Sequence, residues 1–164
     1  MNAFVLYDSK FGNTERIAET IALALQEAVP TRLSAIEDVP DLAAGLTDVD
    51  ILVVGGPTQV HGVSAGLRHL IETLGEDSLK GVRTAAFDTR LHGMKIVTGS
   101  AAVRLEKLLR RRGAWLVVPA VSFIVEGREG PLQPGEVEHA RAFALEVLHA
   151  VGIRVHERPQ VPAV

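Results

Sequence analysis

The sequence predicts a three-layer α/β/α sandwich built on a five-stranded parallel sheet. Short apolar runs alternate five times with segments whose apolar residues recur at helical spacing. This alternation is typical of a parallel sheet with helices on both faces. The first and third runs are apolar without polar alternation, which indicates strands buried on both faces. The chain has 164 residues and is 47% hydrophobic, so one domain with a full core is expected.

The expected strands are the short apolar runs between turns and helices. They span residues 3–7, 31–36, 50–55, 83–87 and 114–125. The last strand contains Pro119, and proline within a strand indicates an edge or a bulge. A doubly wound strand order of 2-1-3-4-5 places that strand at an edge, so we predict this order.

The expected helices carry apolar residues along one face. They span residues 14–28, 64–74, 100–112 and 135–151, with a short helix or irregular crossover at 38–46. In the first helix, Ile17, Ile21 and Leu25 recur with the period of a helix buried on one side. Ser64 is the expected N-cap of the next helix, and Gly113 is the expected cap residue after the helix at 100–112.

The loop Ser9-Lys-Phe-Gly-Asn-Thr14 follows the first strand and opens the first helix. A helix N-terminus presents unpaired amides and partial positive charge, which suit a phosphate group. Gly12 lets the backbone approach an anion, and Ser9, Asn13 and Thr14 add short donors. An ordinary turn with Thr14 as the cap is the alternative interpretation. Lys10 either adds charge to a phosphate site or faces solvent.

This loop resembles the phosphate-binding loop of the flavodoxin family, Ser/Thr-x-Thr-Gly-Asn-Thr, which binds the phosphate of FMN. The order of elements extends the resemblance over nearly the whole chain, and it is sharpest at residues 4–18 and 51–58. There Gly55 and Thr58 match the family's Gly-x-Pro/Ser-Thr after the third strand. The resemblance implies a flavodoxin-like fold with FMN as cofactor.

In that family, three loops meet at the carboxyl ends of the strands and surround the cofactor. The loops after strands three and four flank the isoalloxazine ring, and Asp88 falls where short-chain flavodoxins carry an Asp after strand four. The cofactor-binding residues that the resemblance implies are Ser9, Lys10, Phe11, Gly12, Asn13, Thr14, Pro57, Thr58, Gln59, Val60, His61, Gly62, Asp88, Thr89, Arg90, Leu91 and His92.

The ring-side loops depart from the usual family pattern. Gln59 stands where many flavodoxins have Trp, and Leu91 is the nearest counterpart of a frequent Tyr. Phe11 also replaces a hydroxyl donor of the phosphate loop. An aromatic pair contributes about 0.5–1.5 kcal/mol beyond its buried area, so we expect FMN to bind weakly or to be lost readily.

The same loops contain more cations than carboxylates. His61, Arg90 and His92 accompany a single acid, Asp88. Cations beside a reduced flavin stabilise its negative charge. We therefore expect a second reduction step that is less difficult than in acidic flavodoxins and a less persistent one-electron-reduced form. The alternative is that both histidines are ordinary exposed loop residues.

Several function classes are excluded or disfavoured. The chain has no cysteine, which removes disulfides, thiolate catalysis and cysteine-ligated metal sites. No Gly-x-Gly-x-x-Gly or Walker A sequence follows the first strand. Asp8 is not the acceptor of a receiver-type phosphorylation site, because that site needs a second Asp where Gly55 stands. No basic stripe with interleaved aromatics is present, so nucleic acid is not an expected partner.

Location and surface features allow only general expectations. The N-terminus enters a strand without a basic leader, and no apolar run is long enough to span a membrane. We expect a cytoplasmic protein, with residues 1–152 as the domain and 153–164 as a loosely ordered tail. Trp115 is expected in the core. Residues 110–112, three arginines, are expected to be solvated or to contact another subunit.

Three functions fit these observations. The first is an FMN-binding flavodoxin-like protein in electron transfer, with a redox partner protein or a small-molecule electron acceptor. The second is an FMN-dependent oxidoreductase of the protoporphyrinogen oxidase or quinone reductase type. The third is a flavodoxin-fold binding module that no longer holds FMN. Either a monomer or a homodimer is consistent with the sequence.

Overall fold

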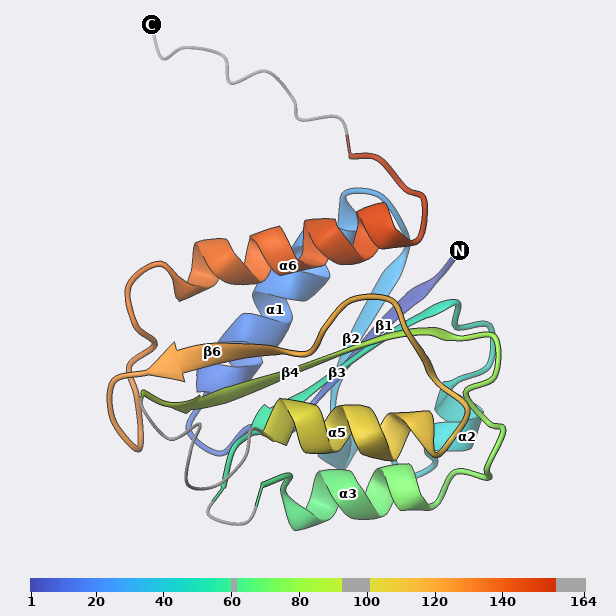
Figure 1. Cartoon of the computed structure of the whole chain (residues 1–164), viewed down its shortest axis with the longest axis horizontal. Helices are drawn as coiled ribbons and strands as arrows, with labels where there is room; N and C mark the ends of the chain where they lie inside the picture. The colour runs from blue at the N-terminus through green and yellow to red at the C-terminus, as the bar shows by residue number, and fades with distance from the viewer. Residues whose placement is uncertain (60–61, 93–100, 156–164) are drawn as a thin grey trace, which may run out of the picture.

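Helices cover both faces of a single sheet in the computed structural model, which describes residues 1–59, 62–92 and 101–155. Helices α1 (Asn13–Gln26) and α6 (Glu136–Ala150) lie on one face. Helices α3 (Ala65–Glu72) and α5 (Ala101–Arg110) lie on the other (Figure 1). The predicted three-layer sandwich is confirmed.

The sheet is parallel throughout. Its strands are β1 (Ala3–Tyr7), β2 (Thr31–Ala35), β3 (Ile51–Pro57), β4 (Arg83–Leu91), β5 (Trp115–Leu116) and β6 (Val121–Val125). They run in the order β2-β1-β3-β4-β5, and β6 also pairs with β4. The predicted order is therefore confirmed, but two short strands share the last position. Pro119 lies between them, where a residue without an N–H interrupts the pairing.

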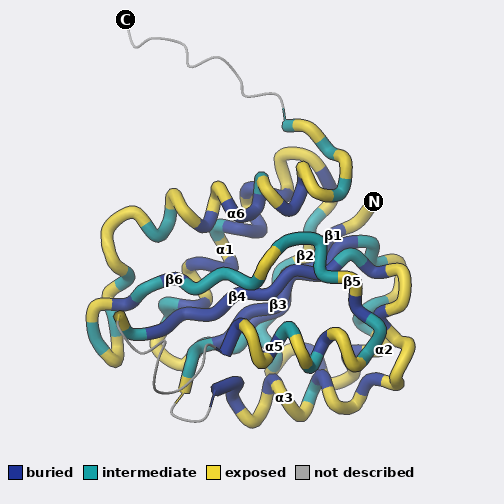
Figure 2. Tube along the Cα trace, viewed as in Figure 1, coloured by how far each residue is buried: buried dark blue, intermediate teal, exposed yellow. Residues whose placement is uncertain are grey.

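The two faces of the sheet have separate apolar cores. Successive side chains of a strand point to opposite faces. Along β1, Val5 therefore joins the core under α1 and α6, whereas Phe4 and Leu6 join the core under α3 and α5. All five residues of β1 are buried, and Figure 2 shows that β3 and β4 are also buried along most of their length. This double burial explains the apolar runs without alternation.

Gly55 in β3 lies where a larger residue would collide with the ring of a neighbouring side chain. A Cβ at Gly55 in β3 would lie 2.0 Å from Cζ of Phe87. Phe87 in β4 packs edge-on against Phe123 of β6, with ring centroids 5.8 Å apart. The ring of Phe87 therefore fills the space that a side chain at position 55 would need.

The crossover between β2 and β3 contains two short helices. They are the 3-10 helix η1 (Ile36–Asp38) and α2 (Leu42–Gly45), which agrees with the predicted short helix or irregular crossover at 38–46. Asp41 caps α2 by accepting from the amide of Ala44 at 3.1 Å.

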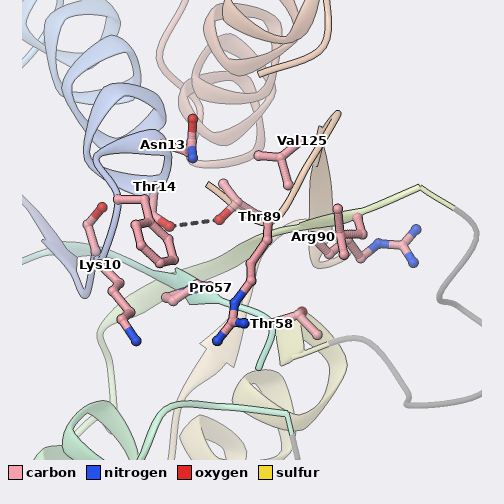
Figure 3. Close-up of a pocket in the computed structure, with 12 residues that line it drawn as sticks. Lys10, Asn13, Thr14, Pro57, Thr58, Thr89, Arg90 and Val125 are labelled. Atoms are coloured by element: carbon pink, nitrogen blue, oxygen red, sulfur yellow. Dashed lines mark hydrogen bonds between the residues drawn. The ribbon is translucent and has the colours of Figure 1, made fainter. Parts of the chain in front are cut away.

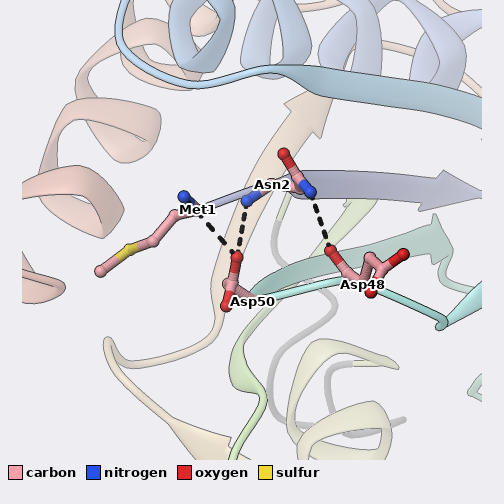
Figure 4. A network of polar contacts seen from close by, with 4 residues as sticks. All are labelled: Met1, Asn2, Asp48 and Asp50. Atoms are coloured by element: carbon pink, nitrogen blue, oxygen red, sulfur yellow. Dashed lines mark hydrogen bonds and ion pairs between the residues drawn. The ribbon is translucent and has the colours of Figure 1, made fainter.

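The N-terminus is held against the segment that precedes β3 (Figure 4). The amide of Asn2 donates to Oδ2 of Asp50 at 2.7 Å, and its side chain donates to the carbonyl of Asp48 at 3.1 Å. The terminal amine of Met1 lies 3.8 Å from the same Asp50 oxygen. These contacts set the register of β1 beside β3 at the end remote from the strands' carboxyl ends.

Two predictions about strands β4 and β5 were wrong. Trp115 is 64% exposed rather than part of the core, because β5 is a two-residue edge strand that leaves its side chain toward solvent. Strand β4 continues to Leu91, so the residues from Asp88 onward are strand rather than loop. After the last helix, Ile153 and Val155 pack against the core under α1 and α6.

Candidate functional site

The loop between β1 and α1 ends in a left-handed glycine. Gly12 is the N-cap of α1 with φ 84, and as a glycine it has no side chain with which to cap the helix. The alternative that Thr14 is the cap is therefore wrong. A Cβ at Gly12 would meet nothing within 4 Å, so the backbone conformation rather than crowding requires glycine. Asn13 and Thr14 are the first residues of the helix, and amides at that position have no intrahelical partner.

Ser9 holds this loop in shape. Its Oγ accepts from the amide of Gly12 at 3.2 Å and from the amide of Glu15 at 3.3 Å. The hydroxyl hydrogen remains available to donate to a ligand. The loop is thus organised around its own polar groups before any anion binds.

A segment after β6 closes the loop from the far side. The side chain of Asn13 donates from Nδ2 to the carbonyl of Glu129 at 3.1 Å. Gly130 has φ 111, and a Cβ there would lie 2.6 Å from Oδ1 of Asn13. Sequence reasoning missed this segment. The only local signal was the pair of glycines at positions 127 and 130.

Two further contacts join the start of α1 to the sheet. Oγ1 of Thr14 lies 2.7 Å from Oγ1 of Thr89 in β4, and both residues are buried. Beneath the loop, the hydroxyl of Tyr7 donates to Oε1 of Glu15 at 2.9 Å. Burial, followed by this hydrogen bond and the negative charge of Glu15, raises the pKa of Tyr7 to about 12.

The loop after β3 starts as a narrow turn against β4. The amide of Thr58 donates to the carbonyl of Thr89 at 2.8 Å. Gln59 and Gly62 exchange two backbone hydrogen bonds, of 3.0 and 2.9 Å. Val60 and His61, which the resemblance placed beside the ring, lie outside the described residues.

Asp88 has a different position from the one predicted. Its carboxylate is fully buried, and Oδ2 accepts from Oγ1 of Thr58 at 2.6 Å and from the amide of Ala102 at 3.0 Å. Oγ1 of Thr58 in turn accepts from the amide of Ala101 at 3.2 Å. A carboxylate at a helix N-terminus is stabilised by the helix dipole. Asp88 therefore anchors α5 to the sheet and does not line the hollow described next.

A hollow opens at the carboxyl ends of the strands, between the loop at residues 9–14 and the ends of β3 and β4 (Figure 3). It brings together ten of the predicted site residues: Ser9, Lys10, Phe11, Asn13, Thr14, Pro57, Thr58, Thr89, Arg90 and Leu91. Val125 and Arg128 also line it, and neither was predicted. Gly12, Gln59, Gly62, Asp88 and His92 are described but are not among the lining residues. Phe11 is 42% exposed.

The hollow is cationic and contains an unpartnered buried side chain. Among the described residues that line it, Lys10, Arg90 and Arg128 are basic and none is acidic. Arg90 is only 7% exposed. Its Nε and Nη1 atoms are buried and make no hydrogen bond within the described structure. Such an arrangement favours an anionic or acceptor-rich ligand, because buried polar groups otherwise pair.

Other kinds of site are not found in the described part of the chain. No group of three or more His, Cys, Asp or Glu residues there could hold a metal ion. None of the helices formed by those residues is both long and apolar enough to cross a membrane.

A family model described as a flavodoxin domain matches residues 4–127. The chain belongs to the flavodoxin family. Solved flavodoxins also share its fold. Oxidised flavodoxin 1 from Bacillus cereus superposes with a TM-score of 0.74 and is 22% identical, over 91% of this chain and 98% of that one.

Two further structures show how widely this fold is used. A WrbA-like flavodoxin protein from Agrobacterium tumefaciens is 23% identical, with a TM-score of 0.72 over 93% of this chain and 99% of that one. The rubredoxin oxygen:oxidoreductase of Desulfovibrio gigas is 16% identical, with a TM-score of 0.75 over 92% of this chain. This match covers only 36% of the Desulfovibrio chain, so there the fold is one part of a larger protein.

Proposed function

We propose that this flavodoxin-family protein binds FMN and transfers electrons to a redox partner protein or a small-molecule electron acceptor. The observation that carries the proposal is the loop at residues 9–14. This loop opens α1, and its residues line a hollow that continues to the ends of β3 and β4. The flavodoxin family binds FMN in this way, with phosphate at the first loop and the ring beside the next two.

The residues present fit FMN at both ends of the hollow. At the α1 end, the amides of Asn13 and Thr14 and the hydroxyl of Ser9 supply phosphate donors, and the ammonium of Lys10 adds charge. At the other end, the buried Arg90 offers N–H groups that have no hydrogen-bond partner among the described residues, which suits the acceptor atoms of a flavin ring. When bound, FMN would supply the redox chemistry, and the protein would hold and orient it.

The direct test begins with the purified protein. Flavin absorbance in the purified sample, or saturable binding when FMN is added to a colourless sample, is the expected result. Bound FMN should then accept electrons from dithionite and return them to a one-electron acceptor. Absence of saturable FMN binding to a folded sample would overturn the proposal.

A second candidate is an FMN-dependent oxidoreductase of the protoporphyrinogen oxidase or quinone reductase type. The cationic hollow favours it, because Lys10, Arg90 and Arg128 line the hollow without an acidic neighbour among the described lining residues. Repeated turnover of a hydride donor and a quinone by the FMN-loaded protein would support the enzyme. A single reduction without turnover would support the carrier.

A third candidate is a binding module that has lost the cofactor. Gln59 and Leu91 in place of the usual aromatics favour it, and the ordered phosphate loop opposes it. The same FMN titration decides this case. A cytoplasmic location and a monomeric or homodimeric state remain predictions, which fractionation and light scattering would check.

A further inference from the structure

Arg90 lies on the opposite side of β4 from the phosphate loop. Neighbouring side chains of a strand alternate between the two faces. Thr89 contacts Thr14 at the start of α1, whereas Asp88 contacts Ala102 at the start of α5. Arg90 therefore shares the α5 side with Asp88. A ligand whose phosphate binds the loop at residues 9–14 would have to cross the end of β4 to reach it.

Asp88 is a buried carboxylate on the same face of β4 as Arg90. Asp88 is two residues earlier on the same strand, but no ion pair joins it to Arg90 in the described structure. Its Oδ2 is instead used by Thr58 and Ala102. Arg90 nevertheless has nine-tenths of its surface buried. A buried guanidinium with two donor atoms that make no hydrogen bond destabilises the fold unless a ligand supplies acceptor atoms.

We propose that Arg90 is the counter-charge for the two-electron-reduced ring of FMN, so that the site binds reduced FMN more tightly than oxidised FMN. This inference rests on the proposed function and specifies its redox preference. A hydride donor delivers two electrons and one proton, and it leaves in its oxidised form. The ring that receives them gains one N–H and one negative charge. A guanidinium held in a water-poor site stabilises that charge more than it does in water.

The preference has a measurable thermodynamic consequence. Each tenfold by which the protein binds reduced FMN more tightly than oxidised FMN raises the two-electron midpoint potential above that of free FMN by about 30 mV. A nearby cation also favours the fully reduced, anionic ring over the neutral one-electron-reduced form. Arg90 would therefore favour electron transfer in pairs.

The first experiment measures both redox states in the Arg90→Gln and Arg90→Lys variants. Reductive titration with dithionite and FMN titration of the oxidised protein give the potentials and the affinities. Arg90→Gln should lower the two-electron midpoint potential and raise the yield of the one-electron-reduced form. It should also weaken the binding of reduced FMN at least tenfold more than the binding of oxidised FMN. Arg90→Lys should keep most of the wild-type midpoint, because it retains the charge.

The matched control is Arg83→Gln. Arg83 opens the same strand at its opposite end, so this variant removes the same charge far from the hollow and should leave the midpoint unchanged. Equal weakening of both redox states by Arg90→Gln, or an unchanged midpoint, would overturn the inference while leaving FMN binding intact. If the wild type does not bind FMN, the proposed function and this inference fail together.

A second experiment needs no flavin. Arg90→Met keeps the apolar stem of the side chain and removes the guanidinium. In the flavin-free protein this variant should unfold at the same temperature as the wild type or higher, because the buried Nε and Nη1 atoms of Arg90 have no hydrogen-bond partner in the described part of the chain. A large drop in the unfolding temperature would show that Arg90 stabilises the fold itself, and would overturn its assignment as a ligand-directed charge.

Discussion

The two ends of the hollow differ in how far the protein has already organised them. At the α1 end, Ser9 bonds two loop amides, Asn13 reaches Glu129, and Thr14 reaches Thr89. At the α5 side of β4, Arg90 is buried, and its Nε and Nη1 atoms make no hydrogen bond to the residues that the structure describes. Preorganised groups bind without paying an ordering cost. The α1 end is therefore suited to affinity, and the Arg90 end to discrimination between ligand states.

The largest loss of stability is expected from a substitution at Gly55, in the strand β3 that lies at the hollow. Gly55→Ala would place a Cβ 2.0 Å from the ring of Phe87, and overpacking of this kind costs about 3 kcal/mol. Denaturant unfolding should show that loss. Gly45→Ala is the control, since its new Cβ would have only ordinary contacts, the closest 3.5 Å from Val39. Unfolding of Gly55→Ala at the wild-type midpoint would contradict the packing described for β3 and β4.

Gly130→Ala should affect the α1 end alone. It combines a positive φ with a Cβ 2.6 Å from Asn13, and it should displace the Asn13 side chain from Glu129. We expect FMN affinity to fall by about 1–3 kcal/mol, measured by fluorescence titration. Gly135→Ala is the matched control, with φ 91 but nothing within 4 Å of its new Cβ. Equal losses of FMN affinity in the two variants would show that backbone strain, and not the lost Asn13 contact, weakens FMN binding.

Gln59→Trp should affect the ring-side loop. An indole after Thr58 restores the aromatic that many flavodoxins carry there, and stacking would add about 0.5–1.5 kcal/mol to FMN binding. Quenching of flavin fluorescence and a tighter titration are the expected readouts. Gln59→Leu adds apolar surface without an aromatic face, so a similar gain in that variant would argue against stacking.

The smallest effect is expected at Tyr7, the β1 residue that contacts the start of α1. Tyr7 is the chain's single tyrosine, so ultraviolet absorbance reports its ionisation directly, with an expected pKa of about 12. Because the pKa is higher in the folded state than its ordinary value, the resulting stabilisation is complete below about pH 10 and is lost as the pH rises toward 12. Glu15→Gln should lower this pKa, and a wild-type pKa at the ordinary value for tyrosine would contradict the burial of Tyr7.

The sequence was most informative where local chemistry determines structure. The apolar runs of β1 and β3 predicted buried parallel strands, and Ser64 caps α3 by accepting from the amide of Leu67. Gly113 takes the left-handed conformation expected after α5. The loop at residues 9–14 was also recognisable as the connection that opens α1, because its polar residues are consecutive in the chain.

Features that depend on distant contacts could not be predicted in the same way. Asp88 resembled a loop acid, and its partners Thr58 and Ala102 are 30 and 14 residues away. Arg128 reaches the hollow only because β6 pairs with the end of β4. The exposure of Trp115 follows from the shortness of β5, which no local pattern shows.

The most direct test of the central claim compares FMN with riboflavin, which lacks the phosphate. Ser9→Ala combined with Lys10→Met removes the hydroxyl and the ammonium assigned to the phosphate, so it should weaken FMN binding by roughly 1.5–3 kcal/mol for each lost contact and leave riboflavin binding nearly unchanged. Thr20→Val, farther along α1, is the control and should alter neither affinity. Equal losses for FMN and riboflavin in the double variant would contradict phosphate binding at residues 9–14.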